Sequence, residues 1–284
     1  MKTILVTGSS GLVGSNVVKY LADKNCRIIA AVRASKVDEY RLLADVEVVP
    51  NEAILEGDIK GVDVVVNCAF ARSNKAEELA AAVDFTQKLI GGLLKSGVEN
   101  VINVSSQGVY KRLPVGSLST EDSPIEPMDL YSMTKYAVEK MFELSALPCV
   151  TNIRLASINM KQRFLYRFVQ SAKEEGKIYL NSPQVYASLL DVEDAAEALA
   201  LLALSDPEGW KPVYNLSIGQ QFSLAQYAEV VRAVGERLGY HSGIVIEDNG
   251  NASAAGSDSS LLCADIGWKP AVTNEMMVKK MFEM

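Results

Sequence analysis

The chain has 284 residues, 49% of them hydrophobic, which is enough to fill one large core or two smaller ones. Its net charge is −7 and its 28 Lys and Arg residues are spread along the sequence, so nucleic acid is not an expected partner. No apolar stretch is long enough for a signal peptide or a membrane-spanning helix, which predicts a cytoplasmic protein without membrane contact.

Apolar runs and amphipathic segments alternate over the first half of the chain. Residues 3–7 form a β-branched run and 12–22 place apolar side chains on one helical face, so a strand and then a helix are predicted. The same alternation predicts strands over 27–32, 46–49 and 62–66, a helix over 76–95, a strand over 101–104, a helix over 130–144 and a strand over 149–153. Strands that alternate with helices form parallel sheets, and continuous apolar runs fit strands covered on both faces. We therefore predict an α/β fold with a doubly wound parallel sheet.

The pattern loosens after residue 154. Helices are predicted over 164–173, 193–204 and 224–238, with a strand over 213–216. These pieces indicate a smaller lobe, interleaved with late elements of the sheet. Residues 250–260 are rich in Ser, Ala and Gly and lack periodicity, so a mobile loop is predicted there.

The cysteines and the single histidine offer little for metal or nucleophilic chemistry. Cys26, Cys68, Cys149 and Cys263 lie far apart, without a Cys-x-x-Cys pair or a histidine cluster, so neither a disulfide framework nor a metal site is expected. His241 falls in a predicted turn, where a solvated loop residue is expected. Any catalytic mechanism must therefore work without histidine.

A glycine-rich turn joins the first predicted strand to the first helix. Residues 7–14 read Thr-Gly-Ser-Ser-Gly-Leu-Val-Gly, in which the glycines let the backbone approach a pyrophosphate beside the free amides of a helix start. The strand before this turn and the helix after it favour a dinucleotide site over a structural turn. Arg33 follows the second strand, where an acidic residue would bind the ribose of NAD, and an arginine there suits the 2′-phosphate of NADP. NADP is therefore favoured, and NAD stays open because Arg33 can also point into solvent.

Tyr131 and Lys135 open a predicted helix. A spacing of four residues puts both side chains on one helical face. A free tyrosine has a pKa near 10, so a neighbouring ammonium would favour its phenolate. Such a pair also occurs on ordinary surface helices, and its weight comes from following a strand that ends in Ser105-Ser106.

These motifs, taken in order, resemble those of the extended short-chain dehydrogenase/reductases, the NAD-dependent epimerase/dehydratase family. The resemblance rests on the Gly8-x-x-Gly11-x-x-Gly14 spacing, the serine segment and the Tyr-Lys pair, and it extends to residues 190–196, 222–224 and 266–270. It implies a Rossmann-type NAD(P)-binding domain over 1–155, to which 187–217 returns. Residues 156–186 and 218–284 are then expected to form the substrate-binding lobe.

The resemblance also implies a role for each site residue. Ser106, with Ser105 as its competitor, polarises a substrate oxygen, Tyr131 carries the proton, and Lys135 activates the tyrosine and holds the nicotinamide ribose. The residues expected to contact the cofactor are Gly8, Ser10, Gly11, Leu12, Val13, Gly14, Arg33, Asp58, Ile59, Ala69, Phe70, Ala71 and Lys135.

Some positions depart from the family pattern. Gln107 and Gly108 stand where dehydratases carry an acidic pair, so sugar 4,6-dehydration is not expected. Ser157 and Ala187 replace an Asn and the diphosphate-clamping Arg that epimerases often present, and Ala82 replaces a cofactor-side Asn. The cations that follow, Arg163, Arg167 and Lys177, are expected to be solvated surface residues rather than a replacement clamp.

The activity implied is that of an epimerase or ketoreductase acting by hydride transfer on a carbonyl or hydroxyl carbon, with a nucleotide sugar as the leading substrate. An NADPH-dependent reductase of a smaller carbonyl compound and a non-catalytic NAD(P)-sensing protein are the alternatives. A homodimer is expected, because the helices over 76–95 and 130–144 carry more apolar residues than one covered face needs and family members pair through them.

Overall fold

The computed structural model describes residues 1–40, 46–159 and 163–284, and its centre is a seven-stranded sheet. The strand order is β11-β6-β5-β4-β1-β2-β3, and every neighbouring pair is parallel. The strands are β1 (Lys2–Thr7), β2 (Cys26–Val32), β3 (Val46–Pro50), β4 (Val64–Asn67), β5 (Asn100–Ser106), β6 (Cys149–Leu155) and β11 (Val213–Leu216). The predicted doubly wound parallel sheet is confirmed.

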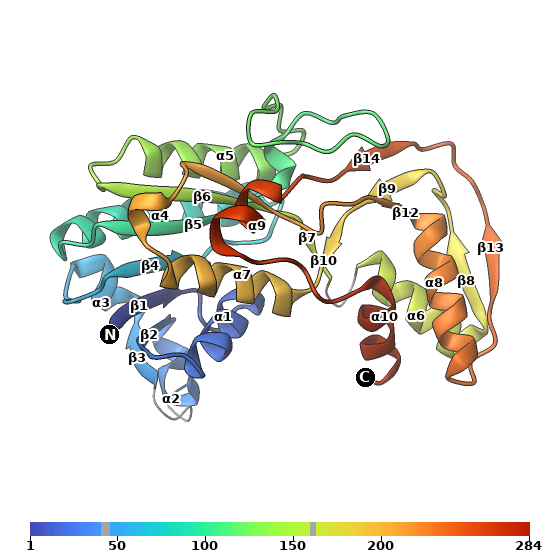
Figure 1. The fold of residues 1–284 in the computed structure, drawn as a ribbon, viewed down its shortest axis with the longest axis horizontal. Helices are drawn as coiled ribbons and strands as arrows, with labels where there is room; N and C mark the ends of the chain where they lie inside the picture. The colour runs from blue at the N-terminus through green and yellow to red at the C-terminus, as the bar shows by residue number, and fades with distance from the viewer. Residues whose placement is uncertain (41–45, 160–162) are drawn as a thin grey trace.

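Helices cover both faces of this sheet (Figure 1). Successive side chains of a strand point to opposite faces, and Ile4 and Val6 of β1 enter one core cluster whereas Leu5 enters another. The cluster with Ile4 includes buried residues of α1 (Leu12–Ala22) and α7 (Val192–Leu204). The cluster with Leu5 includes those of α3 (Asn51–Glu56), α4 (Ala76–Lys95) and α5 (Leu130–Glu143). Shorter pieces complete this half: η1 (Ala34–Lys36), α2 (Val37–Tyr40), η2 (Gln107–Val109), η3 (Pro207–Gly209) and α9 (Ser260–Ile266).

A row of buried polar side chains crosses the sheet from β1 to β6. Thr7, Asn67, Asn103 and Asn152 occupy neighbouring register positions on four adjacent strands. The Thr7 hydroxyl donates to Asn67 at 2.6 Å, the Asn67 amide to Asn103 at 3.0 Å and the Asn103 amide to Asn152 at 2.8 Å. Each buried amide is thus satisfied by the next, which favours one register of strand pairing over any slipped one.

A smaller lobe packs beside the carboxyl ends of the strands, at the right of Figure 1. Helices α6 (Phe164–Glu175), α8 (Leu224–Arg237) and α10 (Asn274–Phe282) surround a separate core cluster that contains Phe168, Tyr227 and Phe282. Short strands pair around these helices: β7 (Ser157–Ile158) with β10 (Leu189–Leu190), β8 (Lys177–Leu180) with β13 (Gly243–Ile246), and β9 (Val185–Ala187) with β12 (Phe222–Ser223) and β14 (Ser253–Ala255).

The prediction of a loop over 250–260 was wrong in one respect. This segment contains β14, which pairs in parallel with β9. A three-residue strand made of Ser and Ala shows no period, because its register is fixed by a partner strand far away in the sequence. The proposed domain limits stay a prediction, and 160–162, within the expected lobe segment 156–186, lie outside the described residues.

The cysteines and the single histidine differ in where they lie. The four cysteines are free thiols of intermediate exposure, and Cys68 lines a cavity at the end of β4. His241 is exposed, with Nδ1 at 3.3 Å from a carboxylate oxygen of Glu236. Within 1–40, 46–159 and 163–284, none of the helices combines the length and the apolar character needed to cross a membrane.

Candidate active site

A cavity of about 490 Å³ opens at the carboxyl ends of the central strands, against the smaller lobe. Residues of the β1–α1 turn, the ends of β4 and β5, the start of α5 and the end of β6 form what we call the sheet wall. The facing lobe wall consists of Arg163, Gln221, Ala254, Ala255 and Gly256. In open parallel sheets, ligands bind at this edge, where the chain crosses from one face of the sheet to the other.

The glycine turn has the tightness that a phosphate cradle requires. Gly8 has a φ of +64°, the Gly11 amide donates to the Gly8 carbonyl at 2.8 Å, and a Cβ on Gly14 would lie 2.4 Å from that carbonyl oxygen. Gly11, Leu12, Val13 and Gly14 line the cavity where α1 begins. The first amides of a helix have no partner within the helix and attract anions. The turn therefore fits the pyrophosphate of a dinucleotide.

The other residues expected at the cofactor lie at different depths. Arg33 and Asp58 are exposed, and Arg33 directly follows β2, which is bonded to the glycine turn through the Ser9 amide and the Ala31 carbonyl at 3.2 Å. Ile59 is 5% exposed and belongs to the core cluster around Leu5. Of the expected cofactor contacts, Gly11, Leu12, Val13, Gly14, Phe70 and Lys135 line the cavity, whereas Gly8, Ser10, Arg33, Asp58, Ile59, Ala69 and Ala71 do not.

Ser106, Tyr131 and Lys135 lie on the wall of this one cavity. The Asp129 carboxylate accepts a 2.7 Å bond from the Ser132 amide, which caps α5 and fixes Tyr131 in its first turn. The Ser106 hydroxyl accepts a bond from the Gly108 amide at 3.1 Å, so its own proton stays available for a substrate oxygen. Burial raises the pKa of Tyr131, and the positive charges of Arg72 and Arg163 oppose that rise.

Lys135 has surroundings that its sequence position did not indicate. The side chain is 5% exposed, its ammonium donates to the Val104 carbonyl at 2.7 Å, and Nζ lies 3.9 Å from the ring centre of Phe70. Phe70 also packs edge-on against Tyr131, with ring centres 5.9 Å apart. Burial lowers the pKa of Lys135 to about 7, although Cys68 and Glu139 oppose the shift. The expected effect of this lysine on the Tyr131 phenolate stays a prediction.

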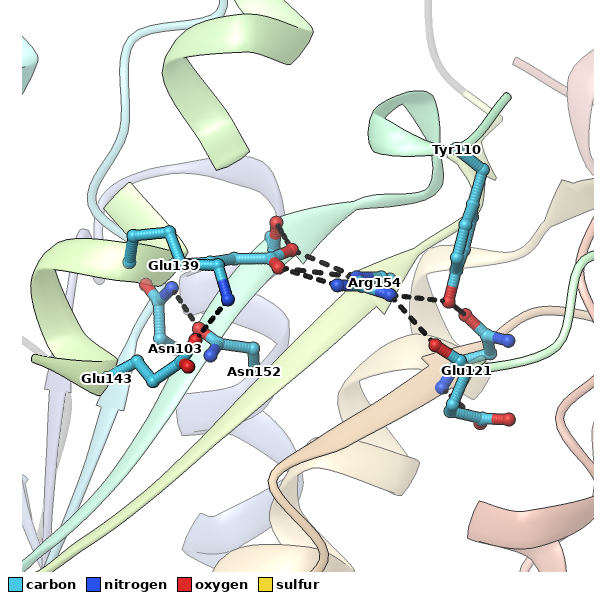
Figure 2. Close-up of polar contacts among 10 residues, drawn as sticks. Asn103, Tyr110, Glu121, Glu139, Glu143, Asn152 and Arg154 are labelled. Atoms are coloured by element: carbon cyan, nitrogen blue, oxygen red, sulfur yellow. Dashed lines mark hydrogen bonds and ion pairs between the residues drawn. The ribbon is translucent and has the colours of Figure 1, made fainter. Parts of the chain in front are cut away.

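A buried ion pair connects α5 to β6 (Figure 2). Arg154 of β6 donates from Nη2 to Glu139 of α5 at 2.9 Å, and from Nη1 to the Tyr110 hydroxyl at 3.0 Å. The Ser105 hydroxyl donates to the same glutamate. Burial disfavours the charged form of Arg154, but Glu139 raises its pKa overall. Because Ser105 is engaged there and is 3% exposed, Ser106 is the better placed of the two serines for a substrate.

Several wall residues were missed or misplaced by sequence reasoning. Arg163, expected on the surface, lines the cavity, whereas Arg167 and Lys177 are exposed as expected and lie outside it. Among the departures from the family pattern, Ser157 lines the cavity, whereas Ala187 and Ala82 do not. Arg72, Arg112, Gln221 and residues 254–256 were not foreseen. Of these, only Arg72 could have been predicted from the sequence, because it follows the end of the strand that leads to Phe70.

The cavity is electropositive although the protein is acidic overall. Its wall contains five basic side chains and one acidic one, in a chain of net charge −7. The basic residues are Arg72, Lys111, Arg112, Lys135 and Arg163, and the acidic one is Asp129. The Asp129 carboxylate caps α5, so this arrangement suits an anionic ligand.

Comparisons with known proteins bear on the family of the chain and on its fold. A family model described as the NAD dependent epimerase/dehydratase family matches residues 4–217. The low-salt glycan biosynthesis protein Agl12 of Haloferax volcanii is 27% identical over 94% of this chain and 93% of its own length. UDP-glucose 4-epimerase of Vibrio cholerae is 34% identical over 49% of this chain and 45% of its own length.

Solved structures share the whole fold. UDP-N-acetylglucosamine 4-epimerase from Bacillus cereus superposes with a TM-score of 0.80 at 19% identity, over 100% of this chain and 96% of that one. UDP-glucose 4-epimerase from Thermotoga maritima gives a TM-score of 0.79 at 21% identity, over 99% of this chain and 97% of that one. At such identities these structures establish the fold alone.

Proposed function

The chain belongs to the NAD dependent epimerase/dehydratase family, whose members are NAD-dependent enzymes of the oxidoreductase type, and on this premise we propose that it moves hydride to or from a carbonyl or hydroxyl carbon of a nucleotide sugar. One observation carries the proposal: the glycine turn and the Ser106, Tyr131 and Lys135 side chains line a single electropositive cavity. Phosphates of both a dinucleotide and a nucleotide sugar suit that charge. MoeE5, a protein of the same fold, has been solved with UDP-glucose and NAD, which supports this ligand class.

The cofactor assignment rests on residues at the start of the sheet. When bound, the nicotinamide supplies the hydride exchange. The free amides at the start of α1 would hold the pyrophosphate, and Lys135 is placed at the cavity for the nicotinamide ribose. Arg33 is exposed beside the glycine turn, where its guanidinium would pair with a 2′-phosphate. We therefore favour NADP over NAD.

Each catalytic side chain has one task in this proposal. Ser106 donates its hydroxyl proton to the substrate oxygen, because its acceptor lone pair already binds the Gly108 amide. Tyr131 gives or takes the proton at its phenolic oxygen as the substrate carbon changes between alcohol and ketone. Gln107 lines the cavity where an acidic residue would be needed for water elimination, so epimerisation or reduction is favoured over dehydration.

The surplus of basic over acidic side chains on the cavity wall matches an anionic nucleotide sugar better than a smaller, uncharged carbonyl substrate. A sensing protein without chemistry would not need Ser106 and Tyr131 on the same wall. Epimerase and reductase differ in cofactor turnover. An epimerase regenerates its nicotinamide and would be purified with it, whereas a reductase binds NADPH reversibly and releases NADP.

The test is single-turnover hydride transfer with purified protein, each nicotinamide cofactor and a set of UDP- and dTDP-sugars in both 4-hydroxy and 4-keto forms. Nicotinamide absorbance reports reduction or oxidation, and product stereochemistry reports epimerisation. Hydride transfer that Tyr131→Phe removes supports the proposal. Cofactor binding without transfer to any of these sugars would instead favour the small-carbonyl or sensing alternatives.

We also propose that the protein forms a homodimer through α4 and α5. These helices expose large apolar side chains: Leu94 is 39% exposed, Met133 52% and Leu144, which ends α5, 84%. Exposed apolar side chains on neighbouring helices favour association. Sedimentation at micromolar protein concentration should give a dimer, and Met133→Lys should shift it towards monomer; a wild-type monomer would rule the dimer out.

A further inference from the structure

Two arginines from distant parts of the chain lie on the cavity wall near Tyr131. Arg72 follows β4 in the loop after Phe70, and Arg163 is the N-cap residue of α6 in the smaller lobe. The Arg163 Nε is shielded from solvent and has no hydrogen-bond partner among the described residues. A buried guanidinium N–H without an acceptor is costly, which points to a ligand that supplies one.

The charge of Arg72 acts on the Arg163 guanidinium, and both charges act on the tyrosine. Burial lowers the pKa of Arg163, and the charge of Arg72 lowers it further. Both cations act on Tyr131 in the opposite sense to its burial, which raises the pKa of the phenol. Like charges on one cavity wall repel, and an anion bound by both arginines would offset this repulsion and the cost of burying Arg163.

We propose that Arg72 and Arg163 bind an oxyanion of the substrate, a carboxylate or a phosphoryl group, in the cavity that Tyr131 also lines. This inference rests on the proposed function and refines it, because it assigns a charged group of the substrate to a defined part of the cavity. Planar guanidinium groups match carboxylate and phosphate oxygens through paired bonds. A neutral sugar hydroxyl would leave the Arg163 guanidinium without an anionic partner.

The two sources of the oxyanion differ in where the substrate carries it. A hexuronic acid has a carboxylate on the sugar ring, whereas a nucleoside diphosphate sugar has a diphosphate on its anomeric carbon. UDP-glucuronate and UDP-glucose are therefore the matched probes, since they share the diphosphate and differ only in the carboxylate. Inorganic phosphate and glucuronate serve as small oxyanion probes that need no nucleotide site.

The experiment is isothermal titration of each probe into cofactor-saturated protein, for wild type, Arg163→Gln and Arg72→Gln. The control is Arg167→Gln, an exposed arginine on the same helix as the Arg163 cap. Loss of charge-assisted bonds should weaken binding roughly 10- to 100-fold in the first two variants, with no change in the control. Thermal unfolding of each variant checks that it is folded.

A selective loss of UDP-glucuronate binding identifies the carboxylate, and an equal loss for both nucleotide sugars identifies the diphosphate. Unchanged affinities in Arg163→Gln and Arg72→Gln overturn the proposal, as does wild-type protein that binds none of the four probes. Because the readout is affinity, Arg-dependent binding without hydride transfer would leave this subsite standing while the proposed reaction fails.

Discussion

The two walls of the cavity are built in different ways. Each part of the sheet wall lies within a few residues of a strand end or a helix start, and the parallel topology brings those ends to one edge. The lobe wall brings together Arg163, Gln221 and residues 254–256, and the last two lie about 60 and 90 residues after Arg163 in the sequence. Their positions depend on short strands that pair across the lobe. Local sequence signals therefore predict the residues of the sheet wall and not those of the lobe wall.

The walls also differ in the chemistry that they hold. The sheet wall contains the groups that we propose carry a proton and hold a cofactor, and the lobe wall contributes a guanidinium, an amide and small residues. We therefore expect changes in the sheet wall to affect turnover, cofactor binding, the supporting core or, at Arg72, substrate binding. Changes in the lobe wall should affect the substrate alone.

The largest effect is expected from Tyr131→Phe. Its packing against Phe70 survives and only the proton-carrying oxygen is lost, so turnover should fall by about 10²- to 10⁴-fold with cofactor affinity nearly unchanged. Ser106→Ala should lower turnover less, again without loss of cofactor. Single-turnover hydride transfer measures turnover, and cofactor titration measures affinity, for each variant. Full activity in Tyr131→Phe would show that Tyr131 has no catalytic role.

Glu139→Gln tests whether the sheet wall depends on its buried ion pair. The change leaves the Arg154 charge, 6% exposed, without its counter-ion, and the free energy of unfolding should fall by about 3 to 5 kcal/mol. Glu143→Gln on the same helix, where the carboxylate is 54% exposed, should cost less than about 1 kcal/mol. Urea unfolding of both variants measures this, and equal losses would show that the pair is not a special support.

Lys135→Met should alter how stability depends on pH. The folded pKa of about 7 lies below the ordinary 10.5, so between these values the unfolded chain holds a proton that the folded chain lacks. Stability from this group therefore rises as pH increases through that window, by up to about 1.4 kcal/mol per pH unit. Unfolding free energies are measured without cofactor from pH 7 to 9. The value for wild type minus the value for Lys135→Met should increase with pH, and a constant difference would mean that the lysine stays charged.

The smallest effect is expected from Arg33→Asp, which touches an exposed side chain. Loss of the guanidinium should weaken NADP roughly 10- to 100-fold while NAD binding improves or holds. Arg167→Asp, an exposed arginine outside the cavity, is the control. Titration with both cofactors decides the matter, and a variant that changes neither affinity would place Arg33 in solvent.

Most of the sheet half could be predicted because its signals are local. The helices over 12–22 and 76–95 and the strand over 213–216 were predicted with the limits that the structure has. The others were close: β4, for example, begins at Val64 rather than at residue 62. The helix α3 was missed, since six residues between two strands show too little of a helical period. The short lobe strands escaped detection for the same reason, as did β14, which borders the cavity.

The sequence by itself determined the fold class, the glycine turn and the serine, tyrosine and lysine that line the cavity, because each depends on a short run of residues with its own geometry. Only the tertiary structure decided what surrounds them. It placed Arg163 at the cavity rather than on the surface, Lys135 against Phe70 and the Val104 carbonyl, and Ser105 on Glu139 rather than toward the substrate. These outcomes depend on which distant side chains share a buried space, and burial and like-charge repulsion then set the protonation and partners of each group.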